Sequence, residues 1–171
     1  MIGLAIRNIV QFIVLVLLQV LILNQVTFFD GWAQPYLYIY FIIALPFNFP
    51  NRFILPLGFI TGLTIDFFTH TPGIHASATL LLAYLRPYVI KSIRPREGFE
   101  SVTPSIRNMG FSKYLTYIFI LVLAHHIWLF GLLYFSTHLW LVALGHAFLS
   151  TIFTLLLILP IQAFNQDRKT Y

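Results

Sequence analysis

Apolar residues fill most of the chain in long runs, and the polar residues between them come in short clusters. The runs predict six helices, at about residues 9–29, 36–49, 53–69, 74–93, 114–135 and 139–164. The second run is short, since about 14 residues rise only roughly 21 Å, less than the ~30 Å hydrocarbon core of a bilayer. We therefore expect this segment to be shielded by neighbouring helices or to lie in thinned bilayer.

The composition fits a chain that lies in a membrane. It is 59% hydrophobic and 9% charged, whereas soluble domains carry about 25% charged residues and so can cover their surface in water. The fold class that follows is an all-α integral membrane protein, a compact bundle of six transmembrane helices in one domain spanning 1–171. The absence of cysteine excludes disulfides, thiolate metal sites and a cysteine nucleophile.

The basic residues predict the orientation of the bundle. With six spans and a cytoplasmic N-terminus, the C-terminus is cytoplasmic too, and every Lys and Arg falls on or near the inner side. These ten are Arg7, Arg52, Arg86, Lys91, Arg94, Arg96, Arg107, Lys113, Arg168 and Lys169. Membrane topology therefore explains the net charge of +5, and we expect no nucleic acid partner. Residues 94–113 mix both charge signs with Pro, Gly and Ser, as is typical of a cytoplasmic loop that is not a folded module.

The N-terminal segment also has features of a secretory signal. Arg7, the apolar stretch after it and Gly31-Trp32-Ala33 imitate the three parts of a cleaved signal peptide. The stretch is longer than a typical signal core, and bulky Phe28 and Phe29 precede the candidate cleavage site. We expect the segment to be retained as the first helix.

One face of the third helix is the strongest candidate site. Asp66 lies in an otherwise apolar run, where a carboxylate costs roughly 2.5–3.5 kcal/mol even on the mildest insertion scales. Gly58, Gly62 and His70 are spaced four residues apart with it, so the four share one helical stripe. Gly58 and Gly62 form a small-xxx-small motif that allows close helix packing. The stripe is a candidate helix-packing or partner-docking face, and a ligand or ion site at Asp66 is the alternative.

Arg86 and Pro87 interrupt the fourth helix near its inner end. We expect Arg86 to extend to the lipid headgroups beside a proline kink, and a specific anionic-lipid contact is the alternative. Counted at 1.5 Å per residue, Asp66 and Arg86 differ in depth by about 8–10 Å, so we expect no direct ion pair between them.

The histidines raise the question of a metal or haem site. His125 and His126 lie in the middle of the fifth helix, and His146 lies at similar depth in the sixth. Small residues around His146 favour close packing of these helices, so we expect interhelical hydrogen bonds and no cofactor. No catalytic triad, carboxylate pair, P-loop or zinc motif is present, and we expect no enzyme activity.

The run from Leu55 to Val89 resembles the core of the MreD family, the rod-shape-determining membrane proteins of bacteria. The matching features are Gly58, Gly62-Leu63, Asp66, Gly73 and the closing Arg86-Pro87. Phe67-Phe68-Thr69-His70 stand where the family has a further small residue. The resemblance implies a non-catalytic scaffold in the bacterial inner membrane with a fold similar to the substrate-binding subunits of ECF transporters.

The same resemblance implies the partners. They are MreC, bound directly, and through it MreB, a SEDS glycosyltransferase and a penicillin-binding transpeptidase, which together make the lateral cell wall. Membrane lipid is a further expected partner. The alternative function is a small-molecule-binding subunit of an ECF-type transporter, with Asp66, His70 and His75 around an outward-facing pocket.

Overall fold

The computed structural model describes residues 2–93 and 103–167, and apart from one isolated bridge between Phe28 and Ala33 its regular structure is helical. The α-helices are α1 (Ile2–Leu21), α2 (Tyr40–Ile43), α3 (Asn51–Thr69), α4 (Ile74–Ile93), α5 (Ile106–Met109), α6 (Phe111–Leu133) and α7 (Trp140–Asp167). Short 3-10 turns lie at η1 (Leu23–Gln25), η2 (Leu37–Ile39) and η3 (Phe135–Thr137).

The protein is a multi-pass membrane protein by the length and composition of its helices. Four of them, α1, α3, α6 and α7, are long and apolar enough to cross a bilayer. Helix α4 has 20 residues, as many as α1, but it carries more polar side chains. Its polar side chains His75, Thr79 and Arg86 are buried, because α4 packs between α3 and α6, whereas Lys91 at its end is exposed.

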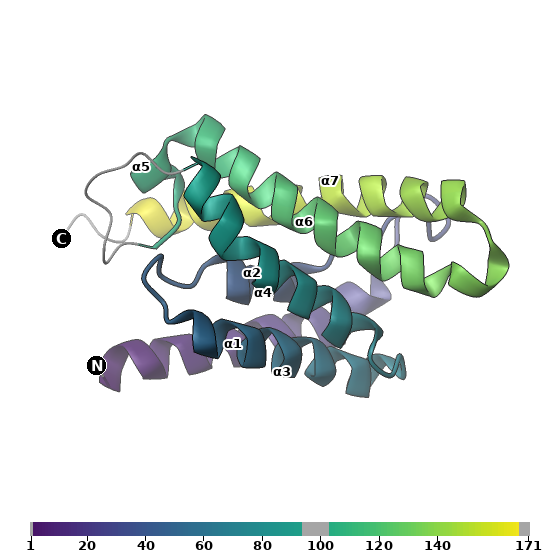
Figure 1. The fold of residues 1–171 in the computed structure, drawn as a ribbon, viewed down its shortest axis with the longest axis horizontal. Coiled ribbons are helices and arrows are strands. Elements are labelled where there is room, and N and C mark those ends of the chain that lie inside the picture. The colour runs from purple at the N-terminus through teal and green to yellow at the C-terminus, as the bar shows by residue number, and fades with distance from the viewer. Residues whose placement is uncertain (1, 94–102, 168–171) are drawn as a thin grey trace.

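The helices form three layers (Figure 1). Helices α1 and α3 make one outer layer, α6 and α7 make the other, and α2 and α4 lie between them. The starts of α1, α3 and α6 and the ends of α4 and α7 lie together at one end of the bundle, at the left of Figure 1. We call this the basic end, since it carries all the exposed Arg and Lys of the described residues: Arg7, Arg52, Lys91, Arg107 and Lys113.

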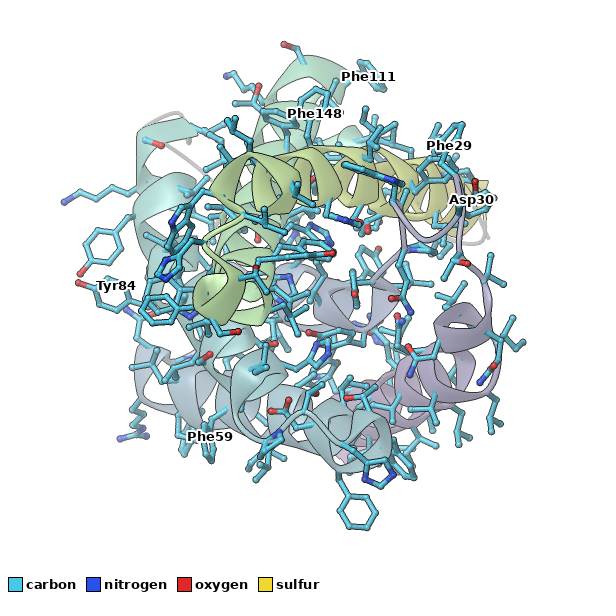
Figure 2. All side chains as sticks on the ribbon, turned by 90° about the vertical axis from the view of Figure 1, so that its right-hand side faces the viewer. Phe29, Asp30, Phe59, Tyr84, Phe111 and Phe148 are labelled. Carbon is cyan, nitrogen blue, oxygen red and sulfur yellow. The ribbon has the colours of Figure 1, made fainter. Side chains whose placement is uncertain are left out.

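The exterior is apolar on every side of the bundle. Phe59, Tyr84 and Phe148 come from three different helices and point outward in different directions (Figure 2). Such a surface is unfavourable in water and suits hydrocarbon, since lipid tails are as apolar as the side chains.

Two sequence predictions of helix bounds were wrong. The first helix begins at Ile2, seven residues before the predicted start at Ile9, and ends at Leu21, eight residues before the predicted end at Phe29. The second predicted helix, 36–49, contains only η2 and α2, which together span 37–43. The chain from 22 to 43, here called the return segment, passes back toward the basic end partly as extended backbone, and its residues from Tyr36 to Ile43 are all buried. The expectation that neighbouring helices shield this short segment is confirmed.

Extended backbone at this depth needs hydrogen-bond partners within the protein, because hydrocarbon supplies none. Gln19 of α1 provides two of them. Its Nε2 donates to the carbonyl of Pro35 at 3.1 Å, and its Oε1 accepts from the amide of Leu37 at 2.8 Å. The Gln19 side chain is fully buried, so it serves the return segment alone and not the lipid face.

Helix α7 completes this pairing from the opposite side. The hydroxyl of Ser150 accepts from the amide of Gln34 at 3.1 Å, and the hydroxyl of Thr154 accepts from the amide of Tyr36 at 3.0 Å. The two hydroxyls are four residues apart and therefore lie on one face of α7. The return segment is thus held between α1 and α7 by side chains that replace the hydrogen bonds of a helix.

The predicted cytoplasmic loop, 94–113, is described in part. Residues 94–102 lie outside the described residues. The remainder contains α5 and the start of α6, and the Ser105 hydroxyl caps α5 by accepting from the amide of Asn108 at 3.2 Å.

Replacing Gln19 with leucine tests the role assigned to it. The change keeps the size but leaves the Leu37 amide and the Pro35 carbonyl unpaired, and each unpaired buried group costs roughly 1–3 kcal/mol. We expect Gln19→Leu to lower the free energy of unfolding by about 2 kcal/mol or more, measured by denaturant titration in detergent. Gln25→Leu, at an exposed glutamine nearby, is the control and should change little. Equal stability of both variants would contradict the assignment.

Candidate functional site

The glycines of the predicted stripe are covered by α4. A Cβ atom added at Gly62 would lie 2.5 Å from the Cα of Ala76 and 2.6 Å from its amide nitrogen. At Gly58 it would lie 2.7 Å from the Cβ of Ala83. All three distances are shorter than non-bonded atoms can approach, so α4 packs directly on the α3 backbone. Of the two roles open to these glycines, packing within the chain is the one they have here.

Asp66 joins the same two helices by hydrogen bonds. Its Oδ1 accepts from the amide of His75 and from the hydroxyl of Thr71, both at 2.9 Å, and its Oδ2 accepts from the amide of Ala76 at 2.8 Å. These amides lie in the first turn of α4, which has no partner of its own for them. Gly73 precedes the helix and has no side chain that could serve as the N-cap.

Asp66 therefore caps α4 from a neighbouring helix. A negative charge at a helix N-terminus is also favoured by the helix dipole. The backbone carbonyl of Asp66 accepts the amide of His70, which ends α3. One residue thus ends one helix and begins the next, and the carboxylate that looks costly in sequence is satisfied by backbone donors.

His70 is separate from the rest of the stripe. It follows α3 with a left-handed backbone, φ 57°, and its side chain is exposed. The helical spacing that relates Gly58, Gly62 and Asp66 ends one residue before it. His70 instead lines an open hollow of about 780 Å³ together with Leu63, Asp66, Phe67, Phe68 and Pro72.

Arg86 does not reach the lipid headgroups, and that prediction was wrong. Its side chain is buried, and its guanidinium donates to the backbone carbonyls of Leu45 and Pro46. The second of these bonds is 3.2 Å long. Helix α4 continues through Pro87 to Ile93. The prediction that Asp66 and Arg86 form no ion pair is confirmed, since each is bound elsewhere.

The reason for burying Arg86 is the early end of α2. The last carbonyls of a helix have no partners within it, and those of α2 lie inside the protein. Arg86 binds two carbonyls beyond α2, and the Tyr117 hydroxyl of α6 donates to the carbonyl of Ile43 at 2.9 Å. This site was not predicted from the sequence. A continuous helix over 36–49 would have paired the carbonyls of Leu45 and Pro46 differently, and Arg86 would not have been needed to bind them.

A second buried polar cluster lies between α4, α6 and the return segment. The Tyr38 hydroxyl is 3.0 Å from Nδ1 of His75 and 2.9 Å from Nε2 of His125. On the other side of α6, Nδ1 of His126 is 3.2 Å from the Thr151 hydroxyl of α7. The predicted interhelical hydrogen bonds of His125 and His126 are confirmed, and Nδ1 of His126 also lies 2.8 Å from the carbonyl of Val122 in its own helix.

His146 also bonds across the α6–α7 hairpin. Its Nε2 is 2.9 Å from the hydroxyl of Tyr134, which follows α6. Its ring stacks on Trp32 of the return segment, with ring centres 4.7 Å apart and planes at 3°. The tyrosines of this cluster were missed in sequence, although Tyr36, Tyr38 and Tyr40 alternate through the second apolar run.

No group of three or more His, Asp or Glu side chains in residues 2–93 and 103–167 is arranged to hold a metal ion. Comparisons with protein-family models, with curated proteins and with solved structures found no match to this chain. The function therefore has to be inferred from the residues and their geometry.

Gly62→Ala tests the packing of α3 on α4. The added methyl group would collide with the backbone of α4, which cannot move aside as a side chain could. We expect a loss of about 1–3 kcal/mol in unfolding free energy, the usual cost of overpacking. Gly131→Ala is the matched control, because its nearest neighbour is a side-chain atom of Trp140 at 4.0 Å. A melt in detergent should rank Gly62→Ala well below Gly131→Ala, and the reverse order would contradict the packing.

Asp66→Asn tests the cap on α4. An asparagine keeps one acceptor oxygen but turns its amide toward a backbone N–H, so at least one hydrogen bond and the negative charge are lost. We expect destabilisation of roughly 1–3 kcal/mol and faster amide hydrogen exchange in the first turn of α4. Asp30→Asn, at an exposed aspartate, is the control. Unchanged exchange at His75 and Ala76 in Asp66→Asn would show that the carboxylate is not the cap.

Proposed function

We propose that this chain is a non-catalytic membrane scaffold that binds the transmembrane helix of MreC in the bacterial inner membrane. Through MreC it would belong to the elongation complex with MreB, a SEDS glycosyltransferase and a penicillin-binding transpeptidase, and so support cell shape and lateral wall synthesis. The resemblance of the run from Leu55 to Val89 to the MreD core supports this proposal, as does the all-helical, multi-pass fold.

One observation carries the proposal. Among the residues that the structure describes, the two buried charged side chains are Asp66 and Arg86, and both bind backbone groups of this chain. An intramembrane charge marks a substrate or ion site by default, but here the two charges close the core. The surface left for interaction is apolar side chains of helices, which suits another helix or lipid.

The distribution of charge supports the proposed topology. The exposed basic residues of the described part of the chain gather at the basic end (Figure 1), which we assign to the cytoplasm together with both termini. The bundle would then cross the membrane six times, with the return segment as the second crossing and α4 as the fourth.

The docking face for MreC must lie away from the Gly58–Gly62 face, because α4 covers that face. Leu55, Phe59, Leu63 and Phe67 follow one another at four-residue spacing on α3, and all are exposed. We call this row the α3 outer row. It leads into the open hollow, which Leu63 and Phe67 line. We assign the MreC helix to this row.

Photo-crosslinking tests the assignment. A photoreactive amino acid at Leu63 should crosslink to MreC when both proteins are made in the same cells. The same amino acid at Leu144 of α7, which is 50% exposed against 46% for Leu63, is the matched control and should give no adduct. If MreC co-purifies but crosslinks only from Leu144, the face is wrong. If MreC neither co-purifies nor crosslinks, the scaffold function is wrong.

The open hollow supports a test of the alternative function, which is the binding of a small molecule. Asp66 and His70 line it, as expected for a small-molecule subunit of an ECF-type transporter. His75 does not complete that site, because its Nδ1 binds Tyr38 inside the core. A rise in the melting temperature of the purified protein with a vitamin would favour transport over scaffolding.

A further inference from the structure

The Tyr38 hydroxyl lies between two imidazoles that come from different helices. His75 belongs to α4 and His125 to α6, while Tyr38 belongs to the return segment. Tyr38 and His125 are fully buried, and His75 is 4% exposed. The three side chains, here called the His–Tyr–His triad, are therefore shielded from water and from lipid.

The number of protons in the triad limits its hydrogen bonds to two arrangements. A tyrosine hydroxyl has one proton, and a neutral imidazole has one N–H. Thr79 adds no proton of its own, because its hydroxyl lies closer to the carbonyl of His75, at 2.8 Å, than to Tyr38, at 3.4 Å. Tyr38 must therefore donate to one histidine and accept from the other.

The unpaired nitrogen of His125 decides between the two arrangements. Its Nδ1 is buried and has no hydrogen-bond partner. If Tyr38 donated to His125, Nδ1 would carry the proton and be an unpaired buried donor. If His125 donates through Nε2, Nδ1 is only an unpaired lone pair, and buried unpaired N–H groups are the rarer case. In the favoured arrangement His125 donates to Tyr38, and Tyr38 donates to Nδ1 of His75.

The groups around the triad place one charge beside it. From α3, Asp66 binds the backbone amide of His75. From α6, the His126 ring centre lies 5.2 Å from that of His125, and from the return segment, the Tyr36 ring centre lies 5.6 Å from that of His75. Of these neighbours, Asp66 is the one that carries a formal charge, and it adjoins His75 and not His125.

We propose that the His–Tyr–His triad is a proton-binding site. A proton binds at His125, and transfer of protons through Tyr38 places the resulting positive charge on His75. The incoming proton takes the free lone pair on Nδ1 of His125. The Nε2 proton of His125 passes to the oxygen of Tyr38, and the Tyr38 proton passes to Nδ1 of His75. One proton has then been gained, His125 and Tyr38 are neutral, and His75 is an imidazolium next to Asp66.

The transfer reverses both hydrogen bonds of Tyr38. Afterwards His75 donates to Tyr38, and Tyr38 donates to Nε2 of His125. Because these bonds join α4, the return segment and α6, protonation of one histidine changes the tautomer of the other. The triad therefore couples α4, which Asp66 caps, to α6, which packs against it. This inference does not rest on the proposed function, and its test needs no partner protein.

Nitrogen-15 NMR of the histidine side chains tests the proposal on the full chain in nanodiscs. At neutral pH we expect His125 and His75 both to carry their proton on Nε2. On acidification, His75 should gain a second proton and His125 should change from Nε2–H to Nδ1–H at the same pH midpoint. His70, whose side chain is exposed and lies outside the triad, is the internal reference for the histidine signals.

Tyr38→Phe removes only the hydroxyl that links the two rings. In this variant His125 should no longer change tautomer at the midpoint of His75, a loss that a purely structural role of Tyr38 would not cause. Separate midpoints in the unmodified protein, or His125 protonated on Nδ1 at neutral pH, would overturn the proposal. No change of either histidine over the pH range in which the protein stays folded would overturn it as well.

Discussion

The structure depends on one constraint: every backbone amide and carbonyl at membrane depth must find its partner within the protein, because hydrocarbon offers none. A continuous helix meets this constraint by itself, but the return segment does not. Gln19 from α1 and Ser150 and Thr154 from α7 supply the missing partners. These three side chains hold the two outer layers of the bundle to the segment between them, so the return segment becomes the centre of the fold.

The same constraint explains the two buried charges. The first turn of α4 has free amides, and the carboxylate of Asp66 accepts two of them. The chain beyond α2 has free carbonyls, and the guanidinium of Arg86 donates to two of them. Each charge thus lies where backbone groups of opposite polarity would otherwise be unpaired, which offsets the cost of burying it. A charged residue in a membrane helix is evidence for a substrate site only if no unpaired backbone groups of the same protein bind it.

Because both buried charges bind backbone groups inside the bundle, the protein has a closed polar interior and an apolar exterior. The interior holds the His–Tyr–His triad and the Arg86 contacts, and the exterior offers the α3 outer row, with Asp66 between the two at the open hollow. Such a division suits a protein that joins other membrane helices without rearranging its own core. It also explains part of the composition of α4: because α3 and α6 pack against this helix, its polar residues His75, Thr79 and Arg86 are buried in protein.

The sequence by itself determined the membrane class, the positions of α3, α4, α6 and α7, and the close packing implied by Gly58 and Gly62. Hydrophobic runs and small-residue spacing are local properties, and a helix satisfies its own backbone whatever surrounds it. The sequence did not reveal the break in the second apolar run or the burial of Arg86, since both depend on partners distant in the chain. Tyr36 to Phe49 is apolar enough to be one continuous helix, but its helical part spans only 37–43. The side chains of Gln19 and Thr154, placed beside it by the tertiary structure, accept the amides of Leu37 and Tyr36 where no earlier turn of helix can do so.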